Sequence, residues 1–155
     1  MDEPRRPFAY RLAAVLRKDR WEGEVLGAEA SRALQLVEEA RRREQETLAR
    51  VAQAEAELRE QCGERQTIPL ERRRLVLLFL REQYVLAETR GRERTKAEGL
   101  HAQVLQQLET KRRSIKALEH HEERQRHAHE GAQARAAFKA SDDAWLVRML
   151  TEDGR

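Results

Sequence analysis

Apolar and alanine residues recur at intervals of three and four along almost the whole chain. This spacing places them on one face of a helix and is typical of the seam of a coiled coil. Alanine in a seam lets a partner backbone approach closely but buries little apolar area. The clearest stripe of the first half, which includes two polar positions, is Leu26, Ala30, Ala33, Val37, Ala40, Glu44, Thr47, Val51, Ala54 and Leu58.

One segment, Gly63 to Pro69, interrupts this pattern. Glycine is favoured just past the end of a helix, proline is favoured at the first position of the next one, and the residue before a proline is extended. We therefore predict a helix from about residue 8 to 62, a turn at 63–69 that reverses the chain, and a helix from about residue 70 to 150. The clearest stripe of the second helix is Leu100, Val104, Leu108, Ile115 and Leu118.

The predicted fold is all-α: two long helices form an antiparallel coiled-coil hairpin, in a single domain over residues 1–155. The second helix is the longer one, and at about 1.5 Å per residue it extends about 25 residues beyond the start of the first. Charged residues make up 38% of the chain and aromatic residues 5%, which leaves too little apolar material for a globular core. Mixed charge and periodic apolar residues favour the hairpin over disorder.

The formal net charge is only +3, so long-range attraction to nucleic acid is weak. No apolar run approaches the roughly 18 residues that span a bilayer, and residues 1–7 lack the features of a secretory signal, so we expect a cytoplasmic protein.

The single cysteine, Cys62, has no partner for an internal disulfide. The histidines at positions 101, 120, 121, 127 and 129 include no i,i+4 pair, so we expect a solvated helix face and neither metal nor cofactor.

Motifs of catalysis are missing from the sequence. It contains no phosphate-binding glycine loop, zinc-protease pair or nucleophile elbow, and we expect no enzymatic activity. Basic triplets at 41–43, 72–74 and 111–113 are interleaved with acidic residues along the same helices. We interpret these triplets as solvated faces rather than as phosphate-binding sites.

The strongest apolar run, Leu75 to Leu80, directly follows the predicted turn and is continued by Tyr84, Val85 and Leu86. It is apolar all round, so one face can pair with the first helix while another must face outward. An exposed apolar face of this kind marks a partner-binding site. The alternative is burial, either by self-association or in a small cluster at the tip with Ile68 and Leu70.

A second group of apolar and basic residues lies at the two ends of the chain, which an antiparallel hairpin brings toward the same end. It forms either a shared partner surface or an end cap. Its apolar members are Phe8, Tyr10, Leu12, Val15 and Leu16 at one terminus and Phe138, Trp145, Leu146, Val147 and Leu150 at the other, with basic residues that include Arg11, Arg17 and Arg148.

Three segments carry a resemblance to a known family: residues 8–18 (FAYRLAAVLRK), 69–83 (PLERRRLVLLFLREQ) and 142–148 (DDAWLVR). In these segments, in length and in layout, the chain resembles the FliJ/YscO family, the central-stalk proteins of type III secretion and flagellar export. The resemblance covers essentially the whole chain. The short length and the tryptophan near the C-terminus favour the injectisome branch.

The resemblance implies a non-enzymatic stalk that promotes secretion. Its open end would sit in the pore of a hexameric export ATPase, and its tip would reach the cytoplasmic domain of the inner-membrane export gate. Leu75, Leu78 and Phe79 become candidates for contact with the gate. The candidates for contact with the ATPase ring are Arg11, Arg17, Trp145 and Arg148.

In isolation such a stalk is expected to be monomeric and peripherally associated with the secretion apparatus, without membrane insertion; whether secretion chaperones also bind it stays open. A competing hypothesis is an independent coiled-coil adaptor or dimerising scaffold that binds partners along its length. A third, binding of nucleic acid, predicts an affinity that falls steeply with salt.

Overall fold

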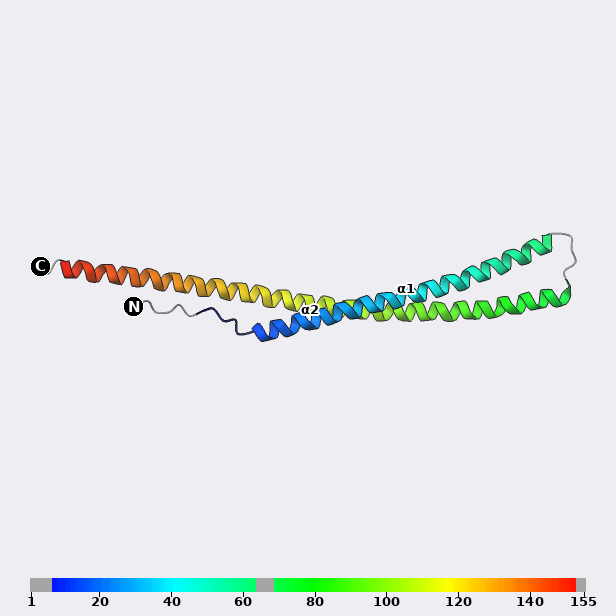
Figure 1. Ribbon diagram of the computed structural model, residues 1–155, viewed down its shortest axis with the longest axis horizontal. Helices are drawn as coiled ribbons and strands as arrows, with labels where there is room; N and C mark the ends of the chain where they lie inside the picture. Colours follow the sequence, from blue (N-terminus) through cyan, green and yellow to red (C-terminus); the bar gives the residue numbers. More distant parts are fainter. Residues whose placement is uncertain (1–6, 64–68, 153–155) are drawn as a thin grey trace. The chain divides into compact units, whose positions relative to one another are not determined.

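The computed structural model describes residues 7–63 and 69–152, and the side chains of residues 7–60 and 69–149. Its secondary structure within these ranges is two helices, α1 (Ala13–Gly63) and α2 (Leu70–Glu152) (Figure 1). The predicted all-α hairpin, with the second helix the longer, is confirmed. The predicted turn falls mainly on residues 64–68, which lie outside the described residues.

Contacts along the chain group into two units, Met1–Gly23 with Thr110–Arg155 (unit 1) and Glu24–Glu109 (unit 2). A division of this kind is natural for two paired helices, because a side chain on one helix contacts only the facing turns of the other and no central core connects distant turns.

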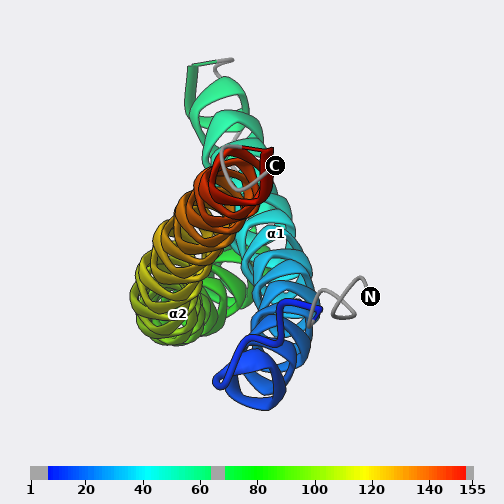
Figure 2. The ribbon, with the colours of Figure 1, turned by 90° about the vertical axis from the view of Figure 1, so that its left-hand side faces the viewer.

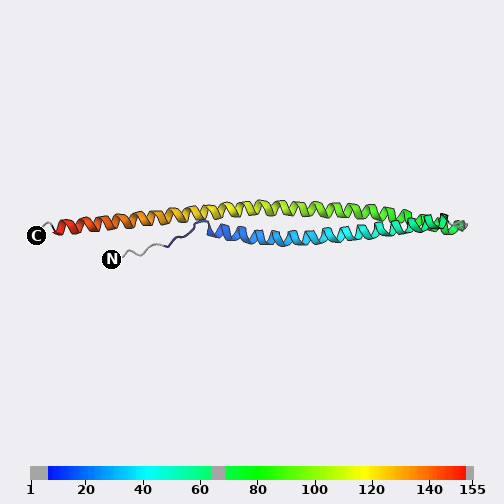
Figure 3. The same cartoon turned by 90° about the horizontal axis from the view of Figure 1, so that it is seen from above.

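In unit 2, α1 and α2 lie side by side and run antiparallel (Figures 1 and 3). The cross-helix contacts show the direction, since later residues of α2 meet earlier residues of α1: Tyr84 with Glu55, Arg94 with Glu44, and Glu98 with Arg41. The predicted α1 stripe forms the seam. Its most buried members are Ala30, Val37, Thr47 and Val51.

The stripe predicted for the second helix is wrong at Leu100, whose side chain is 51% exposed. Counting back from the buried Leu108 in steps of four and three gives Val104, His101 and Ala97, which are half-buried. The seam therefore passes beside Leu100. The apolar pattern predicts only apolar seam positions, whereas the seam of α2 also includes polar ones. Its members are Val76, Leu80, Gln83, Ala87, Arg90, Arg94, Ala97, His101, Val104 and Leu108.

Unit 1 continues the same spacing of three and four. Leu16 is buried on α1, and Ile115 and Leu118 are half-buried on α2. The helices approach closely at Gly23, where a Cβ atom would lie 3.2 Å from Cδ1 of Ile115. A larger residue at Gly23 would force Ile115 to move.

The first helix starts at Ala13, five residues later than predicted. Residues 7–10 are not helical, and a turn at 11–12 leads into α1, with the amide of Ala13 donating to the carbonyl of Tyr10 at 3.2 Å (Figure 2). Phe8 and Tyr10 both contact α2. An extended segment points residues two apart to the same side, whereas a helix turns them about 200° apart, so these contacts require the segment to stay extended.

Candidate functional site

The apolar run at the start of α2 is divided between two faces in unit 2. Leu80 faces α1 and is only 7% exposed. Leu75, Leu78 and Phe79, the candidates for gate contact, are 67%, 48% and 42% exposed. Leu70 is 81% exposed, so it is not covered by a cluster of described residues, and Ile68 lies outside the described residues.

A shallow hollow on the outer side of α2 is lined by three leucines and three arginines, which we call the basic–apolar surface: Leu70, Arg73, Arg74, Leu77, Leu78 and Arg81. A second hollow shares Leu78 and Arg81 and continues along the helix to Thr89. Of the three gate candidates, only Leu78 lines these hollows. Leu75 and Phe79 lie on a different flank of α2, because they follow at i+5 and i+9 from Leu70.

Reasoning from the sequence does not identify the arginines of the basic–apolar surface as candidate binding residues, because it interprets residues 72–74 as a solvated face. A sequence feature that could have identified two of them is the absence of a carboxylate three or four positions from Arg73 or Arg81, in contrast to the many i,i+4 ion pairs elsewhere. An arginine without a carboxylate three or four positions away on its own helix is free to meet one on a partner.

Unit 1 presents a different arrangement, in which the extended N-terminal segment lies on α2. The Tyr10 hydroxyl donates to the Leu118 carbonyl at 3.1 Å and lies 2.9 Å from Nδ1 of His121. The Phe8 ring lies 5.7 Å from the His129 ring and equally far from the Arg126 guanidinium. These contacts fasten the segment to one face of α2.

The predicted solvated histidine face is therefore only partly correct. His120 and His127 are exposed, but His121 and His129 are half-buried beneath the N-terminal segment. Their aromatic partners come from more than a hundred residues away in sequence, and helical spacing within α2 does not reveal them. In the part of the chain that the structure describes, no group of three or more metal-binding side chains is present.

The four candidates for ATPase contact do not form one cluster. Arg11 lies in the hollow between the N-terminal segment and residues 121–129 of α2, and Arg17 is exposed on α1. Trp145 and Arg148 are exposed on the last turns of α2. Sixteen residues of helix, about 24 Å, separate Trp145 from the nearest α2 residue of the Arg11 hollow.

The last part of α2, residues 134–149, is exposed on all sides. Three of its large apolar side chains lie on one stripe, because Phe138, Trp145 and Met149 follow at i, i+7 and i+11, whereas Val147 lies on the opposite face. They are 73%, 58% and 45% exposed. Helical stability in proteins comes mainly from the packing of an apolar face, so a partner along this stripe would stabilise this part of α2.

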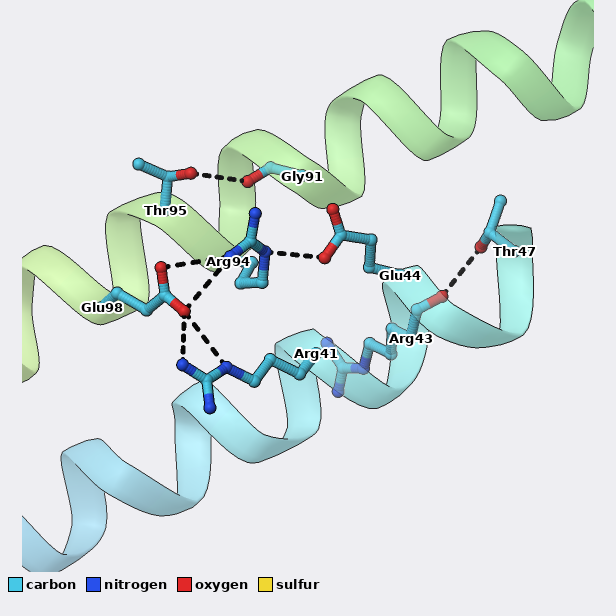
Figure 4. Close-up of polar contacts among 8 residues, drawn as sticks. All are labelled: Arg41, Arg43, Glu44, Thr47, Gly91, Arg94, Thr95 and Glu98. Carbon is cyan, nitrogen blue, oxygen red and sulfur yellow. Dashed lines mark hydrogen bonds and ion pairs between the residues drawn. The ribbon is translucent and has the colours of Figure 1, made fainter. Parts of the chain in front are cut away.

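Polar side chains cross the seam in unit 2 (Figure 4). Arg94 contacts Glu44 at 2.7 Å and Glu98 at 3.3 Å, and Arg41 donates to Glu98 at 2.7 Å. The hydrogen bond from Arg41 is the main cause that lowers the pKa of Glu98. Because a shifted register would separate these charges inside the seam, the network favours one alignment of the two helices.

A second polar cluster crosses the seam in unit 1. The Lys111 ammonium lies 2.7 Å from Glu22 and 3.1 Å from Asp19, and the Ser114 hydroxyl donates to Asp19 at 2.8 Å. Hydrogen bonds from Ser114 and Lys111 lower the pKa of Asp19, and the bond from Lys111 lowers the pKa of Glu22. The two carboxylates, Glu22 first, raise the pKa of Lys111.

These shifts predict how the cluster depends on pH. The lowered pKa values of Asp19 and Glu22 mean that their stabilisation is complete above the ordinary values of 3.8 and 4.5 and is lost as the pH falls through the folded-state values. Because the pKa of Lys111 is raised, its contribution to stability is complete below pH 10.5 and is lost as the pH rises through the folded-state pKa. We expect Lys111→Met to lower the melting temperature at neutral pH and to have a smaller effect at about pH 3.

Circular dichroism melts at both pH values measure this difference, and Lys116→Met, which removes an exposed lysine of α2, is the control. An equal loss of melting temperature at both pH values for Lys111→Met would contradict the role of the cluster.

Neither helix, over its described residues, has a stretch apolar enough to cross a bilayer. Comparison of the chain with family models, with curated proteins and with solved structures gave no match.

Proposed function

We propose that the chain is a non-enzymatic central stalk of a type III secretion apparatus. In this role it couples the hexameric export ATPase to the cytoplasmic domain of the inner-membrane export gate and promotes protein secretion. It acts in the cytoplasm, peripherally associated with the apparatus. Secretion chaperones are a further class of partner that such a stalk can serve.

The observation that carries the proposal is that each unit exposes large apolar side chains on α2. Unit 2 exposes Leu75, Leu78 and Phe79, and unit 1 exposes Phe138 and Trp145. A coupling protein needs two separate binding surfaces, whereas a simple end cap or a single binding site needs one. Exposed apolar groups of this size favour contact with a partner.

Each surface has a proposed role. Leu75, Leu78 and Phe79 contact the gate. In unit 1, Trp145 and Arg148 contact the ATPase ring from the last turns of α2. Arg11 and Arg17 contact the ring at a second position, because the hollow that contains Arg11 is about 24 Å along α2 from Trp145.

Deletion of residues 140–155 tests the ATPase contact. We expect the truncated chain to lose most of its stimulation of a cognate export ATPase, because Trp145 and Met149 are removed while the seams remain. ATP hydrolysis is measured with increasing amounts of stalk. Full stimulation by the truncated chain would mean that the end of α2 is not needed for stimulation of the ATPase.

The apolar stripe of residues 134–149 also supports a second candidate function, a dimerising coiled-coil scaffold. A second copy that packs along Phe138, Trp145 and Met149 would cover this stripe and stabilise this exposed part of α2. Size-exclusion chromatography with light scattering distinguishes the two functions. A monomer agrees with the stalk, and a stable dimer agrees with the scaffold.

A further inference from the structure

The arginines of the basic–apolar surface differ from most other arginines of unit 2 in their surroundings. Elsewhere in the unit, most arginines contact a carboxylate, on the same helix or across the seam. No carboxylate of the described residues lies within ion-pair distance of Arg73, Arg74 or Arg81. Ion pairs outside this surface include Arg41 with Glu98, Arg94 with Glu44, and Arg92 with Glu88.

The apolar half of the surface is equally unpartnered. Leu70, Leu77 and Leu78 are 81%, 50% and 48% exposed, although the first hollow brings them together with the arginines. The second hollow extends the surface to Val85, which is 60% exposed, and its lining includes one carboxylate, Glu82, beside Arg81. From Leu70 to Thr89 the surface follows α2 for about 28 Å.

A helix fits this surface better than an extended peptide. The backbone of α2 is hydrogen-bonded within the helix and offers no free edge to a strand. Leu77 and Leu78 follow Leu70 at seven and eight residues, and Val85 follows them at eight and seven, which is the spacing at which helix side chains interdigitate. The surface is thus an outward second seam, on a different face of α2 from the seam that meets α1.

We propose that the basic–apolar surface is the docking site of an acidic amphipathic helix from another protein. An apolar stripe of about five turns packs on Leu70, Leu77 and Leu78 and continues to Val85. Carboxylates on the flank of that stripe pair with Arg73, Arg74 and Arg81. The inference goes beyond the proposed function, since it specifies the chemistry of the partner and does not require that partner to be an export gate.

Two synthetic helical peptides of about 20 residues test the charge requirement. Both carry the same leucine stripe, with glutamates on its flanks in one and lysines in the other. We expect the full chain to bind the glutamate peptide roughly tenfold or more tightly, measured by fluorescence anisotropy, because three ion pairs each add a modest amount. In the variant R73E/R74E/R81E the preference should reverse in favour of the lysine peptide.

A matched control is R112E/R124E/R135E, which makes the same change of net charge at exposed positions of α2 outside the surface. It should keep the preference for the glutamate peptide, and circular dichroism should show both triple variants folded. Equal affinity for the two peptides, or the same reversal in the control variant, would overturn the proposal. So would concentration-dependent self-association that R73E/R74E/R81E abolishes, because the occupant would then be a second copy.

The outcome is separable from that of the proposed function. If an export-gate domain fails to bind but the charge preference holds and reverses as expected, the stalk proposal fails and the acidic-helix site stands. If the gate domain binds and neither peptide is preferred, the site is wrong and the stalk proposal stands.

Discussion

Phe79→Asp is expected to reduce binding of an export-gate cytoplasmic domain roughly a hundredfold or more, while the helical content of the chain stays unchanged. The Phe79 ring is 42% exposed and would be buried by a partner, so aspartate would place an unpaired charge at the centre of the contact. A loss of about 2.7 kcal/mol corresponds to this factor. Pull-down of the gate domain and titration by isothermal calorimetry measure the change.

Leu100→Asp is the matched control for this prediction. Leu100 also lies on α2, is 51% exposed, and is far along the helix from Phe79. The same apolar-to-acidic change there should leave gate binding within about twofold of the wild type. Unchanged binding by Phe79→Asp would mean that this residue does not contact the gate.

Leu108→Ala is expected to destabilise the paired helices by about 2–4 kcal/mol. Leu108 is 6% exposed and is one of the few large apolar side chains buried in the seam of unit 2, so its removal leaves a cavity in a contact with few other apolar members. Urea unfolding followed by circular dichroism gives the free energy of unfolding.

The same change at Leu100 distinguishes the observed seam from the predicted one. Leu100→Ala is expected to change the free energy of unfolding by less than about 0.5 kcal/mol, because the side chain is largely in solvent. An equal cost for both substitutions would mean that the seam passes through Leu100, as the apolar pattern predicts, and not beside it.

The seam residues of α1 are predicted correctly from the sequence, whereas those of α2 are predicted only in part, because the two helices differ in the polarity of their seam positions. On α1 the seam is dominated by Ala30, Val37 and Val51, so apolar spacing alone identifies it. On α2 it includes Arg94 and Lys111, which look like surface residues until their carboxylate partners on α1 are known. A prediction based on apolar side chains alone therefore assigns Leu100 to the seam, although Leu100 is largely exposed and His101 lies in the seam instead.

The candidate binding surfaces could likewise be predicted only in part from the sequence. The exposed face at Leu75, Leu78 and Phe79 could be predicted, because a run that is apolar all round cannot be covered by one partner helix. The arginines beside it could not be distinguished by charge alone from the paired arginines elsewhere. The absence of a carboxylate three or four positions away distinguishes Arg73 and Arg81 in the sequence, but Arg74 has Glu71 three positions before it, and only the contacts of each side chain show that Arg74 also lacks a partner among the described residues.

The sequence by itself determined that the chain forms two long helices with a break at Gly63 to Pro69, and where the seam of α1 lies, because helical periodicity and helix-ending residues act locally. Only the tertiary structure decided the start of α1 at Ala13 and the burial of His121 and His129. Both follow from Phe8 and Tyr10 lying on α2, a contact between residues more than a hundred positions apart. Contacts of this kind leave no periodic trace in the sequence of either partner.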